Sequence, residues 1–304
     1  MIGTVNKIVY KGFGYTLSSE IPLPELLRCE QGNQVDLEII KADLTHVWSE
    51  AVKNEDKIVV LDQKVMFLVP DTATFCIENG SIITVSPIEG SNEDKIRLYI
   101  LGTCMGVLLM QRKVLPLHGS AIAIDGKAYA FVGHSGAGKS TLANILINRG
   151  YPLLSDDVIA VSLNHENKPI VVPSYPQQKL WQESIHVLGI DKRQYQPLFE
   201  RETKYAVPVP SQYYGAPLPL AGVFELTKAE DIGIEWNPIQ GLDRLHTLFN
   251  HTYRNFLIAR LDLMEWHFQI STRIVNVINM TRIRRSIHGF SANQIASHII
   301  SHAQ

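Results

Sequence analysis

Short apolar runs alternate with turn residues through the N-terminal part of the chain, which is the pattern of β-strands. β-forming residues run from Lys7 to Leu17, apolar and polar positions alternate over 35–39, and 64–69 is a short apolar run. Asn79-Gly80 separates two further runs, and both residues tolerate the positive φ angles of a type I′ turn. The pattern predicts a small, mostly antiparallel domain over residues 1–92, with a hairpin at Asn79-Gly80.

The next segment has the pattern of a buried helix. We expect this helix over residues 93–112, after the boundary sequence Gly90-Ser-Asn-Glu-Asp94, in which Ser91 or Asn92 is a suitable N-cap. Its uncharged stretch from Leu98 to Met110 is shorter than the ~20 residues that cross a bilayer. We therefore expect a helix packed inside a domain, and no membrane partner.

Further along, strands alternate with a helix. The predicted elements are strands over 117–124 and 128–132 joined by Asp125-Gly126, a glycine-rich loop, a helix over 139–148 and a strand over 153–155. A strand, loop, helix and strand in this order indicate a βαβ unit in a sheet with parallel strands. The predicted fold class is α/β, with a larger domain over residues 93–304 after the smaller one.

Prolines interrupt the pattern beyond this unit. We expect irregular loops as far as a strand over 223–227, and long loops commonly carry function. The last predicted element is a helix, because Ser291-Ala-Asn-Gln294 has the spacing of a capping box and Ile295 and Ile299 share one helical face.

Composition narrows the classes of function. The chain has 304 residues, of which 45% are hydrophobic and 19% charged, so disordered, collagen-like and coiled-coil proteins are excluded. Its formal net charge of −2 gives no general attraction to phosphate backbones, and we expect no nucleic-acid partner. Three widely spaced cysteines and an N-terminus without a signal-peptide pattern predict a cytoplasmic protein with reduced thiols.

The glycine-rich loop carries the first candidate chemistry. Residues 133–140, Gly-His-Ser-Gly-Ala-Gly-Lys-Ser, satisfy GxxxxGK[ST] between a predicted strand and a predicted helix, the context that this P-loop motif needs. Its glycines allow backbone N–H groups to surround a phosphate, Lys139 supplies a positive charge, and Ser140 offers a hydroxyl to Mg²⁺. The predicted nucleotide-binding residues are Gly133, His134, Ser135, Gly136, Ala137, Gly138, Lys139, Ser140 and Thr141.

Two carboxylates and a histidine are further candidates. Asp156-Asp157 is predicted to close the strand over 153–155, and ligands of open α/β sheets collect at such strand ends. One carboxylate can then face the metal and the nucleotide, while a solvated acidic turn is the alternative. His118 follows an apolar segment, where a histidine is more commonly a core residue than a catalytic one.

The C-terminal segment is basic. From Trp266 to Gln304 it contains Arg273, Arg282, Arg284 and Arg285 but no Asp or Glu. Arg282, Arg284 and Arg285 are candidate contacts for nucleotide phosphates or for an acidic peptide, and outward-facing surface charges explain the pattern equally well.

In four segments the chain resembles the catalytic domain of bacterial HPr kinase/phosphorylase, a family that phosphorylates a serine hydroxyl on a protein. The segments are Leu-His118-Gly-Ser, the P-loop through Thr141, Asn148-Arg-Gly-Tyr151 and Leu-Leu-Ser-Asp156-Asp157. His118 lies 21 positions before Lys139, and Asp157 lies 18 positions after it, as in the family motif.

The resemblance implies a P-loop-containing, HPr-kinase-like C-terminal domain that uses ATP and Mg²⁺. Asp157 is the implied general base, His118 its neighbour and Lys139 the phosphate ligand. The implied Mg²⁺ ligands are Ser140, Asp156 and Asp157. HPr kinases assemble into rings, so an oligomer is one option for this chain.

Two segments resemble a narrower group. The stretches from Tyr10 to Leu26 and from Pro173 to Trp181 are similar to HPr-kinase-like proteins of lasso peptide biosynthetic clusters. Members of that group phosphorylate the C-terminal serine of a precursor peptide. The leading hypothesis is therefore a peptide serine kinase, with the N-terminal domain as a docking or stabilising module. A P-loop NTPase switch without phosphotransfer and a small-molecule kinase or carboxykinase-like enzyme are the alternatives.

Overall fold

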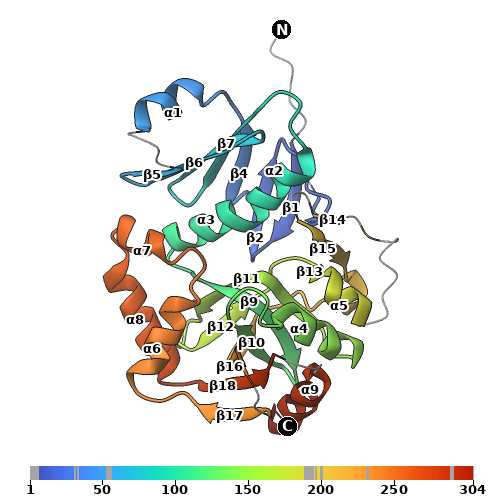
Figure 1. Ribbon diagram of the computed structural model, residues 1–304. Coiled ribbons are helices and arrows are strands. Elements are labelled where there is room, and N and C mark those ends of the chain that lie inside the picture. Colours follow the sequence, from blue (N-terminus) through green and yellow to red (C-terminus); the bar gives the residue numbers. More distant parts are fainter. Residues whose placement is uncertain are drawn as a thin grey trace. The chain divides into compact units, whose positions relative to one another are not determined.

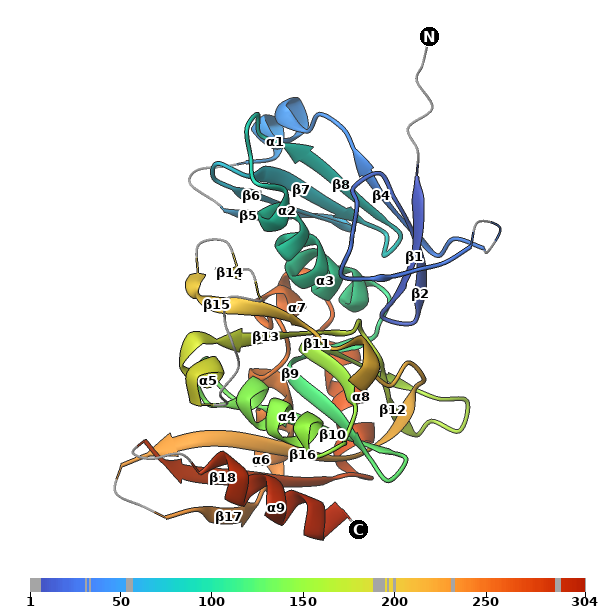
Figure 2. The same cartoon turned by 90° about the vertical axis from the view of Figure 1, so that its right-hand side faces the viewer.

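Two compact units make up the chain: Met1–Val114 with Phe256–Leu263, and Leu115–Asn255 with Met264–Gln304. The computed structural model describes residues 7–30, 32, 34–52, 57–187, 195, 197–198, 201–230, 233–287 and 291–303. Figures 1 and 2 label the elements of both units. Among the described residues, every helix is too short or too polar to traverse a bilayer.

The first unit contains an eight-stranded sheet in the order β3-β1-β2-β4-β8-β7-β6-β5. Its strands are β1 (Ile8–Gly12), β2 (Tyr15–Ser19), β3 (Leu27–Arg28), β4 (Leu37–Lys41), β5 (Ile58–Leu61), β6 (Lys64–Val69), β7 (Ala73–Glu78) and β8 (Ile82–Pro87). Two helices of this unit are α1 (Thr45–Ala51) and α7 (Phe256–Arg260). Only the pairs β2–β4 and β4–β8 are parallel among the described strands of this sheet. The sheet is thus mostly antiparallel, as the sequence predicts.

The predicted Asn79-Gly80 hairpin joins β7 to β8. Asn79 and Gly80 have φ angles of 54° and 62°, and the Ser81 N–H donates to the Glu78 carbonyl at 3.0 Å. These values are those of a type I′ turn, whose twist matches the twist of the two strands.

A buried helix follows the sheet, and Asn92 is its N-cap. The Asn92 side chain accepts hydrogen bonds from the backbone N–H groups of Asp94 and Lys95. The helix runs through α2 (Glu93–Tyr99), a π-helical turn (Ile100–Cys104) and α3 (Met105–Gln111). Every residue from 100 to 110 is buried.

This helix belongs to the first unit, whereas the sequence placed it in the second. The Tyr99 ring lies 5.8 Å from the ring of Phe75 and 6.2 Å from that of Phe67, both on the first sheet. The division therefore falls after Val114 instead of at residue 92, because the apolar side of the helix is buried on strands that precede it.

The second unit contains a seven-stranded sheet in the order β10-β9-β11-β12-β16-β18-β17 and a three-stranded sheet in the order β13-β15-β14. The strands are β9 (Leu115–Ile124), β10 (Lys127–Val132), β11 (Leu153–Leu163), β12 (Pro169–Val172), β13 (Gln177–Trp181), β14 (Pro197–Leu198), β15 (Arg201–Pro208), β16 (Leu218–Ala229), β17 (Glu235–Pro238) and β18 (Asn279–Ser286). The helices are α4 (Lys139–Asn148), α5 (Gln182–Val187), a 3₁₀ turn (Pro210–Gln212), α6 (Leu242–Asn250), α8 (Met264–Val275) and α9 (Ala292–Ala303).

Strand directions in the larger sheet are mixed. β9 is antiparallel to both β10 and β11, so β10 and β11 run in the same direction with β9 between them, and α4 is their crossover. β16 pairs parallel with β10 and with β18. Since β16 also pairs with β12, the strands β10, β9, β11, β12 and β16 form a closed circuit. The fold class is α/β, as predicted, although the sheet is mixed and not purely parallel.

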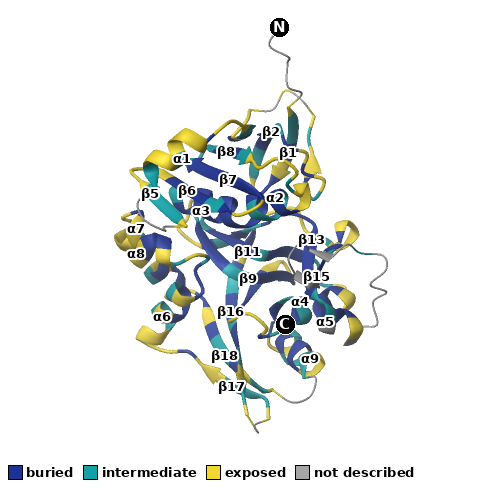
Figure 3. Ribbon diagram, turned by 45° about the horizontal axis from the view of Figure 1, so that its top comes forward, coloured by how far each residue is buried: buried dark blue, intermediate teal, exposed yellow. Residues whose placement is uncertain are grey.

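Helices cover both faces of this sheet. Ile122 and Phe131 share one apolar cluster with residues of α4 and α9, and Ala121 and Ala130 share another with residues of α6 and α8 (Figure 1). Successive strand residues point to opposite faces, so alternate positions of β9 and β10 enter different cores. Figure 3 shows the resulting burial of β9 and β11.

Two further predictions are wrong. The proline-rich stretch after 163 is not irregular, because it contains β12, β13, α5, β14 and β15. The capping box at Ser291 is not formed: α9 begins there, but the buried Ser291 Oγ has no hydrogen-bond partner among the described residues. Proline at the edges of short strands is compatible with pairing, which is why the sequence pattern hid these strands.

Candidate active site

The P-loop has the geometry that its sequence predicts. β10 ends at Val132, α4 begins at Lys139, and Gly133, Gly136 and Gly138 have φ angles of 146°, 76° and 104°. A Cβ on Gly133 would lie 2.5 Å from the Leu226 carbonyl oxygen, so only glycine fits beside β16 at this point. The loop is therefore held against the sheet, and its exposed residues are His134, Ser135 and Gly136.

Lys139 lies across the loop. Its Nζ donates to the carbonyl oxygens of Gly133 at 2.7 Å and His134 at 3.1 Å, and the residue is buried. The ammonium is thus enclosed by the loop whose N–H groups would surround a phosphate. On the same turn of α4, Thr141 Oγ1 lies 2.7 Å from Ser184 Oγ of α5.

Asp156 joins the P-loop helix to β11. It is 3% exposed, and its Oδ1 accepts hydrogen bonds from the hydroxyls of Ser140 at 3.1 Å and Ser120 at 2.5 Å. Its Oδ2 accepts from the backbone N–H of Lys179 at 2.7 Å. A buried carboxylate with this many donors is held in one orientation.

These oxygens suit Mg²⁺. The ion prefers hard oxygen ligands and is commonly held by one or two carboxylates together with substrate phosphates. Ser140 and Asp156 provide a hydroxyl and a carboxylate side by side at the start of α4. The described residues contain no group of three or more His, Cys, Asp or Glu side chains placed to bind a metal by themselves.

Asp157 does not end its strand, contrary to the sequence prediction. β11 continues to Leu163, and Asp157 lies within it opposite Gly119, just after an irregularity in the register between Leu153 and Ser155. The φ angle of Asp157 is 72°, which is uncommon for a residue other than glycine. This local conformation lies at a candidate functional residue, where backbone strain is commonly found.

His118 lies beside Asp157 on the neighbouring strand β9. Its Nδ1 is 3.0 Å from the Asp157 carbonyl oxygen and 3.8 Å from Asp157 Oδ1. Because a carbonyl only accepts, Nδ1 carries the proton in this contact, which sets the tautomer. Gly119, the next residue of β9, allows this strand to pair closely with β10, because a Cβ there would lie 2.1 Å from the Phe131 carbonyl oxygen.

Lys179 completes this group, and the sequence analysis missed it. The side chain is 5% exposed, and its Nζ lies 2.7 Å from Asp157 Oδ2. Burial alone would lower the pKa of the Lys179 ammonium, but the Asp157 carboxylate outweighs burial and raises that pKa above its usual range. The sequence of the short strand Gln177–Trp181 gave little signal, since only Trp181 is a strong strand former in it; the burial of Lys179 is informative because a buried lysine is rare unless paired.

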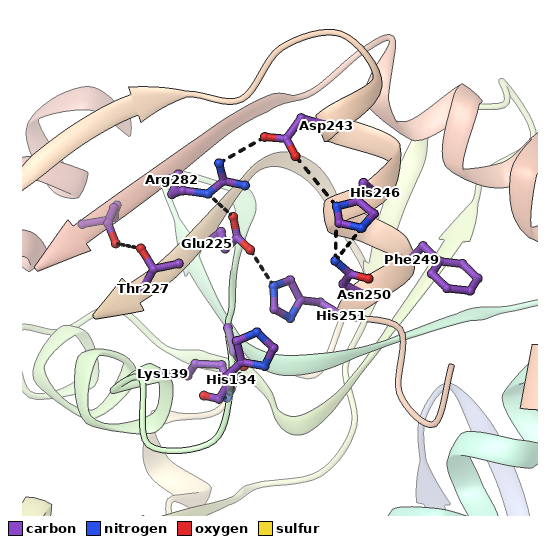
Figure 4. A network of polar contacts seen from close by, with 12 residues as sticks. His134, Lys139, Glu225, Thr227, Asp243, His246, Phe249, Asn250, His251 and Arg282 are labelled. Carbon is purple, nitrogen blue, oxygen red and sulfur yellow. Dashed lines mark hydrogen bonds and ion pairs between the residues drawn. The ribbon is translucent and has the colours of Figure 1, made fainter. Parts of the chain in front are cut away.

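A second polar network lies near the P-loop residues His134 and Lys139 (Figure 4). Glu225 pairs in register with Val132, immediately before the loop. One of its carboxylate oxygens is 2.8 Å from His251 Nε2, and the other is 2.6 Å from Arg282 Nε. Arg282 also contacts Asp243 at 3.1 Å. Burial would raise the pKa of Glu225, but the hydrogen bonds from His251 and Arg282 outweigh it and lower that pKa.

His251 connects this network to His118. The backbone N–H of His118 donates to the His251 carbonyl oxygen at 2.7 Å. The His251 ring lies 5.6 Å from the ring of His134 in the P-loop. Two residues further along, the Tyr253 ring lies 5.7 Å from that of His118. Residues 251–253 therefore form one wall of the site, which the sequence did not indicate.

The three candidate arginines have different surroundings. Arg282 is paired with Glu225 and Asp243, and Arg284 with Glu235 at 2.9 Å. Arg285 donates from Nε and Nη2 to the Ala137 carbonyl oxygen, at 3.1 and 3.0 Å, and so contacts the P-loop backbone. The basic run in the sequence is thus not a single patch, because acidic residues from β16, β17 and α6 neutralise two of its members.

Comparisons with known proteins show partial sequence similarity to HPr kinase/phosphorylases. No family model matches the chain. HPr kinase/phosphorylase of Lactobacillus gasseri is 30% identical over 130 residues, 40% of each chain, and that of Mycoplasmopsis pulmonis is 37% identical over 70 residues, 22% of this chain and 23% of the relative. The HPr kinase/phosphorylase of Chlorobaculum tepidum is 44% identical over 54 residues, which are 18% of this chain and 16% of the relative. The matches thus span at most 40% of the length of these relatives.

One solved structure with a related description is the Hpr(Ser) kinase/phosphatase of Coxiella burnetii, with a TM-score of 0.35 and 16% identity over 62% of this chain and 89% of that chain. The fold and the site define a P-loop protein of the α/β class. Within that class the chain is similar in sequence to HPr kinase/phosphorylases, over a part of its length.

Proposed function

We propose that this protein is a peptide serine kinase that transfers the γ-phosphoryl group of ATP to a serine hydroxyl. The observation that carries the proposal is the position of Asp157, adjacent to the Asp156–Ser140 contact and flanked by His118 and Lys179. Phosphoryl transfer needs a phosphate held in line, its charge neutralised and a base at the attacking hydroxyl. A P-loop switch needs no such base.

In the proposed reaction the serine Oγ attacks the γ-phosphorus, and the bond between this phosphorus and the bridging oxygen of ADP breaks. The serine proton passes to the Asp157 carboxylate. Lys139 and the N–H groups of the P-loop hold the phosphates, with Thr141 on the same turn. Mg²⁺, held by Ser140 and Asp156 together with phosphate oxygens, would supply charge neutralisation.

The acceptor we propose is the C-terminal serine of a ribosomally made precursor peptide, in the cytoplasm. The resemblance of residues 10–26 and 173–181 to lasso peptide kinases supports it. The second of these segments includes β13, which carries Lys179 into the site. This gives the resemblance a direct connection with the chemistry.

The test is transfer of radiolabelled γ-phosphate from ATP, with Mg²⁺, to a peptide library with serine fixed at the last position. We expect labelled peptide from the wild type and none from Asp157→Asn. Release of phosphate without labelled peptide would favour an NTPase switch. Labelling of small hydroxyl compounds but not of peptide would favour a small-molecule kinase or a carboxykinase-like enzyme.

A further inference from the structure

We propose that Lys179 binds the α-carboxylate of the acceptor and thereby selects a serine at the end of a chain over an internal serine. The inference rests on the proposed function, since it names what distinguishes the acceptor at the same site. The proposed transfer step does not use the charge of Lys179.

Lys179 places a buried positive charge directly on the proposed base. Its Nζ is 2.7 Å from Asp157 Oδ2, while the other oxygen of this carboxylate is on the side of His118. The backbone of Lys179 is fixed as well, because its N–H donates to Asp156. The ammonium therefore has a defined position relative to both aspartates.

The ammonium has donors for a second anion. A lysine ammonium has three N–H donors, and within the described part of the chain a single carboxylate, that of Asp157, accepts from it. Tyr175 and Tyr253 lie close enough to interact with it electrostatically. A carboxylate entering here would meet a cation and the polar ends of two tyrosines.

The dimensions of a terminal serine fit this arrangement. Its hydroxyl oxygen and its carboxylate carbon are three bonds apart, which places them about 3–4 Å from each other. A serine whose hydroxyl approaches Asp157 on the His118 side has its carboxylate within reach of a cation that contacts the same aspartate. A cation on a distant element would not meet both conditions.

The same contact would disfavour an internal serine. Replacing the carboxylate by an amide removes one charge-assisted hydrogen bond to an ammonium whose side chain is only 5% exposed. A chain that continues beyond the serine must also pass the space next to a buried side chain. Specificity is commonly achieved by a contact that favours the correct ligand together with an interaction that disfavours the wrong one.

The experiment compares three peptide libraries that share a serine at one fixed position: free acid, C-terminal amide and free acid with one glycine added after the serine. Initial rates of label transfer are measured for the wild type, Lys179→Met, Lys179→Arg and Lys168→Met. Lys168 is an exposed lysine of the same unit, paired with Glu166 on the surface, and serves as the matched control.

We expect the wild type and Lys168→Met to prefer the free acid about 10- to 100-fold, the range for one charge-assisted hydrogen bond. Lys179→Met should reduce this ratio to near one, and Lys179→Arg should keep part of it. Equal rates on the acid and amide libraries with the wild type would overturn the inference and leave the proposed kinase intact. No transfer to any library would refute the proposed function and the inference together.

A second measurement decides the case in which Lys179→Met transfers nothing. The best peptide is resynthesised with alanine in place of its last serine, as acid and as amide, and its binding is measured by fluorescence anisotropy, which needs no catalysis. Wild type should bind the acid more tightly, and Lys179→Met should bind both alike. A variant that keeps the preference for the acid would place the carboxylate site elsewhere.

Discussion

The hydroxyl of Ser140 lies 3.1 Å from Oδ1 of Asp156, although Ser140 is near the start of helix α4 and Asp156 lies beyond its end, in β11. This contact brings the first turn of the P-loop helix to the strand that carries both aspartates. It places the phosphate-binding loop, the proposed metal ligands and the proposed base in a continuous group.

Removing the P-loop lysine should abolish transfer without unfolding the protein. Lys139→Ala deletes the charge that would hold the nucleotide phosphates, so we expect a loss of at least ~10²-fold in kcat/KM, the scale for removing one electrostatic contact to a transition state. The far-ultraviolet circular dichroism spectrum should not change. Full activity in this variant would rule out a nucleotide-binding P-loop.

The two aspartates should give different kinetic effects. Asp157→Asn should leave ATP binding intact and reduce transfer by at least ~10²-fold, the lower range for a general base. Asp156→Asn should mainly raise the Mg²⁺ concentration needed for half-maximal activity, because this carboxylate contacts Ser140. If Asp156→Asn abolishes transfer and Asp157→Asn is mild, the two roles are reversed.

The sequence could predict the P-loop and α4 because both are local: glycines, lysine and helix follow one another within a few residues. It could not place Asp157 in mid-strand, since the pairing of β11 with β9 determines where the strand continues. The role of Lys179 could not be predicted from the sequence for a similar reason. Its role depends on a contact with Asp157, 22 positions away, that only the folded chain forms.

The arginines illustrate the same limit. A run of positive residues predicts a patch only if acidic residues elsewhere do not reach it, and Glu225 and Glu235 lie 57 and 49 positions from their partners Arg282 and Arg284. Strand pairing of β18 with β16 and β17 brings these charges together. Charge counting along the chain cannot detect this.

Substitutions of Arg282 and Arg284 should therefore lower the stability of the protein by different amounts, and they should not differ in their effect on phosphate binding. Arg282→Gln leaves the largely buried Glu225 with one partner, and we expect a loss of about 1–2 kcal/mol in the free energy of unfolding, less than a fully buried pair would cost because the Arg282 side chain is 32% exposed. Arg284→Gln, from a pair that is 44% exposed on both sides, should change it by less than about 0.5 kcal/mol. Urea unfolding of both variants measures the difference. Equal losses of stability in the two variants would contradict the conclusion that the Arg282 pair contributes more than the Arg284 pair.

A fragment of residues 92–304 should be insoluble. It would retain the helix over 93–111 but lack the strands β1–β8 with which this helix forms a unit, and the buried residues from 100 to 110 would face water. Large exposed apolar surfaces promote aggregation. The measurement is the soluble yield of the fragment beside that of the full chain. A soluble, monomeric fragment that binds ATP would contradict this prediction and support a boundary near residue 92.

As the pH falls, the tendency of His267 to bind a proton should destabilise the second unit at a higher pH than protonation of its carboxylates does. This histidine of α8 is buried, and its Nε2 lies 2.8 Å from Thr252 Oγ1. Burial lowers its pKa from 6.5 to about 4, so the folded state holds the ring neutral while the unfolded state binds a proton below pH 6.5. The sign of the effect follows: this contribution to stability is fully present above about pH 6.5 and is lost as the pH falls toward 4.

The expected loss from His267 is about 2 kcal/mol between pH 7 and pH 5, from 1.36 kcal/mol per pKa unit. The carboxylate of Glu225, whose pKa is lowered from 4.5, keeps its stabilising pairs over this interval, so the two effects are separated in pH. Urea unfolding at pH 7 and pH 5 should show the loss in the wild type and in His246→Gln, whose ring is 69% exposed on α6. His267→Gln should be less stable at pH 7 but show a much smaller change between the two pH values. A pH dependence unaltered in His267→Gln would mean that other groups cause it.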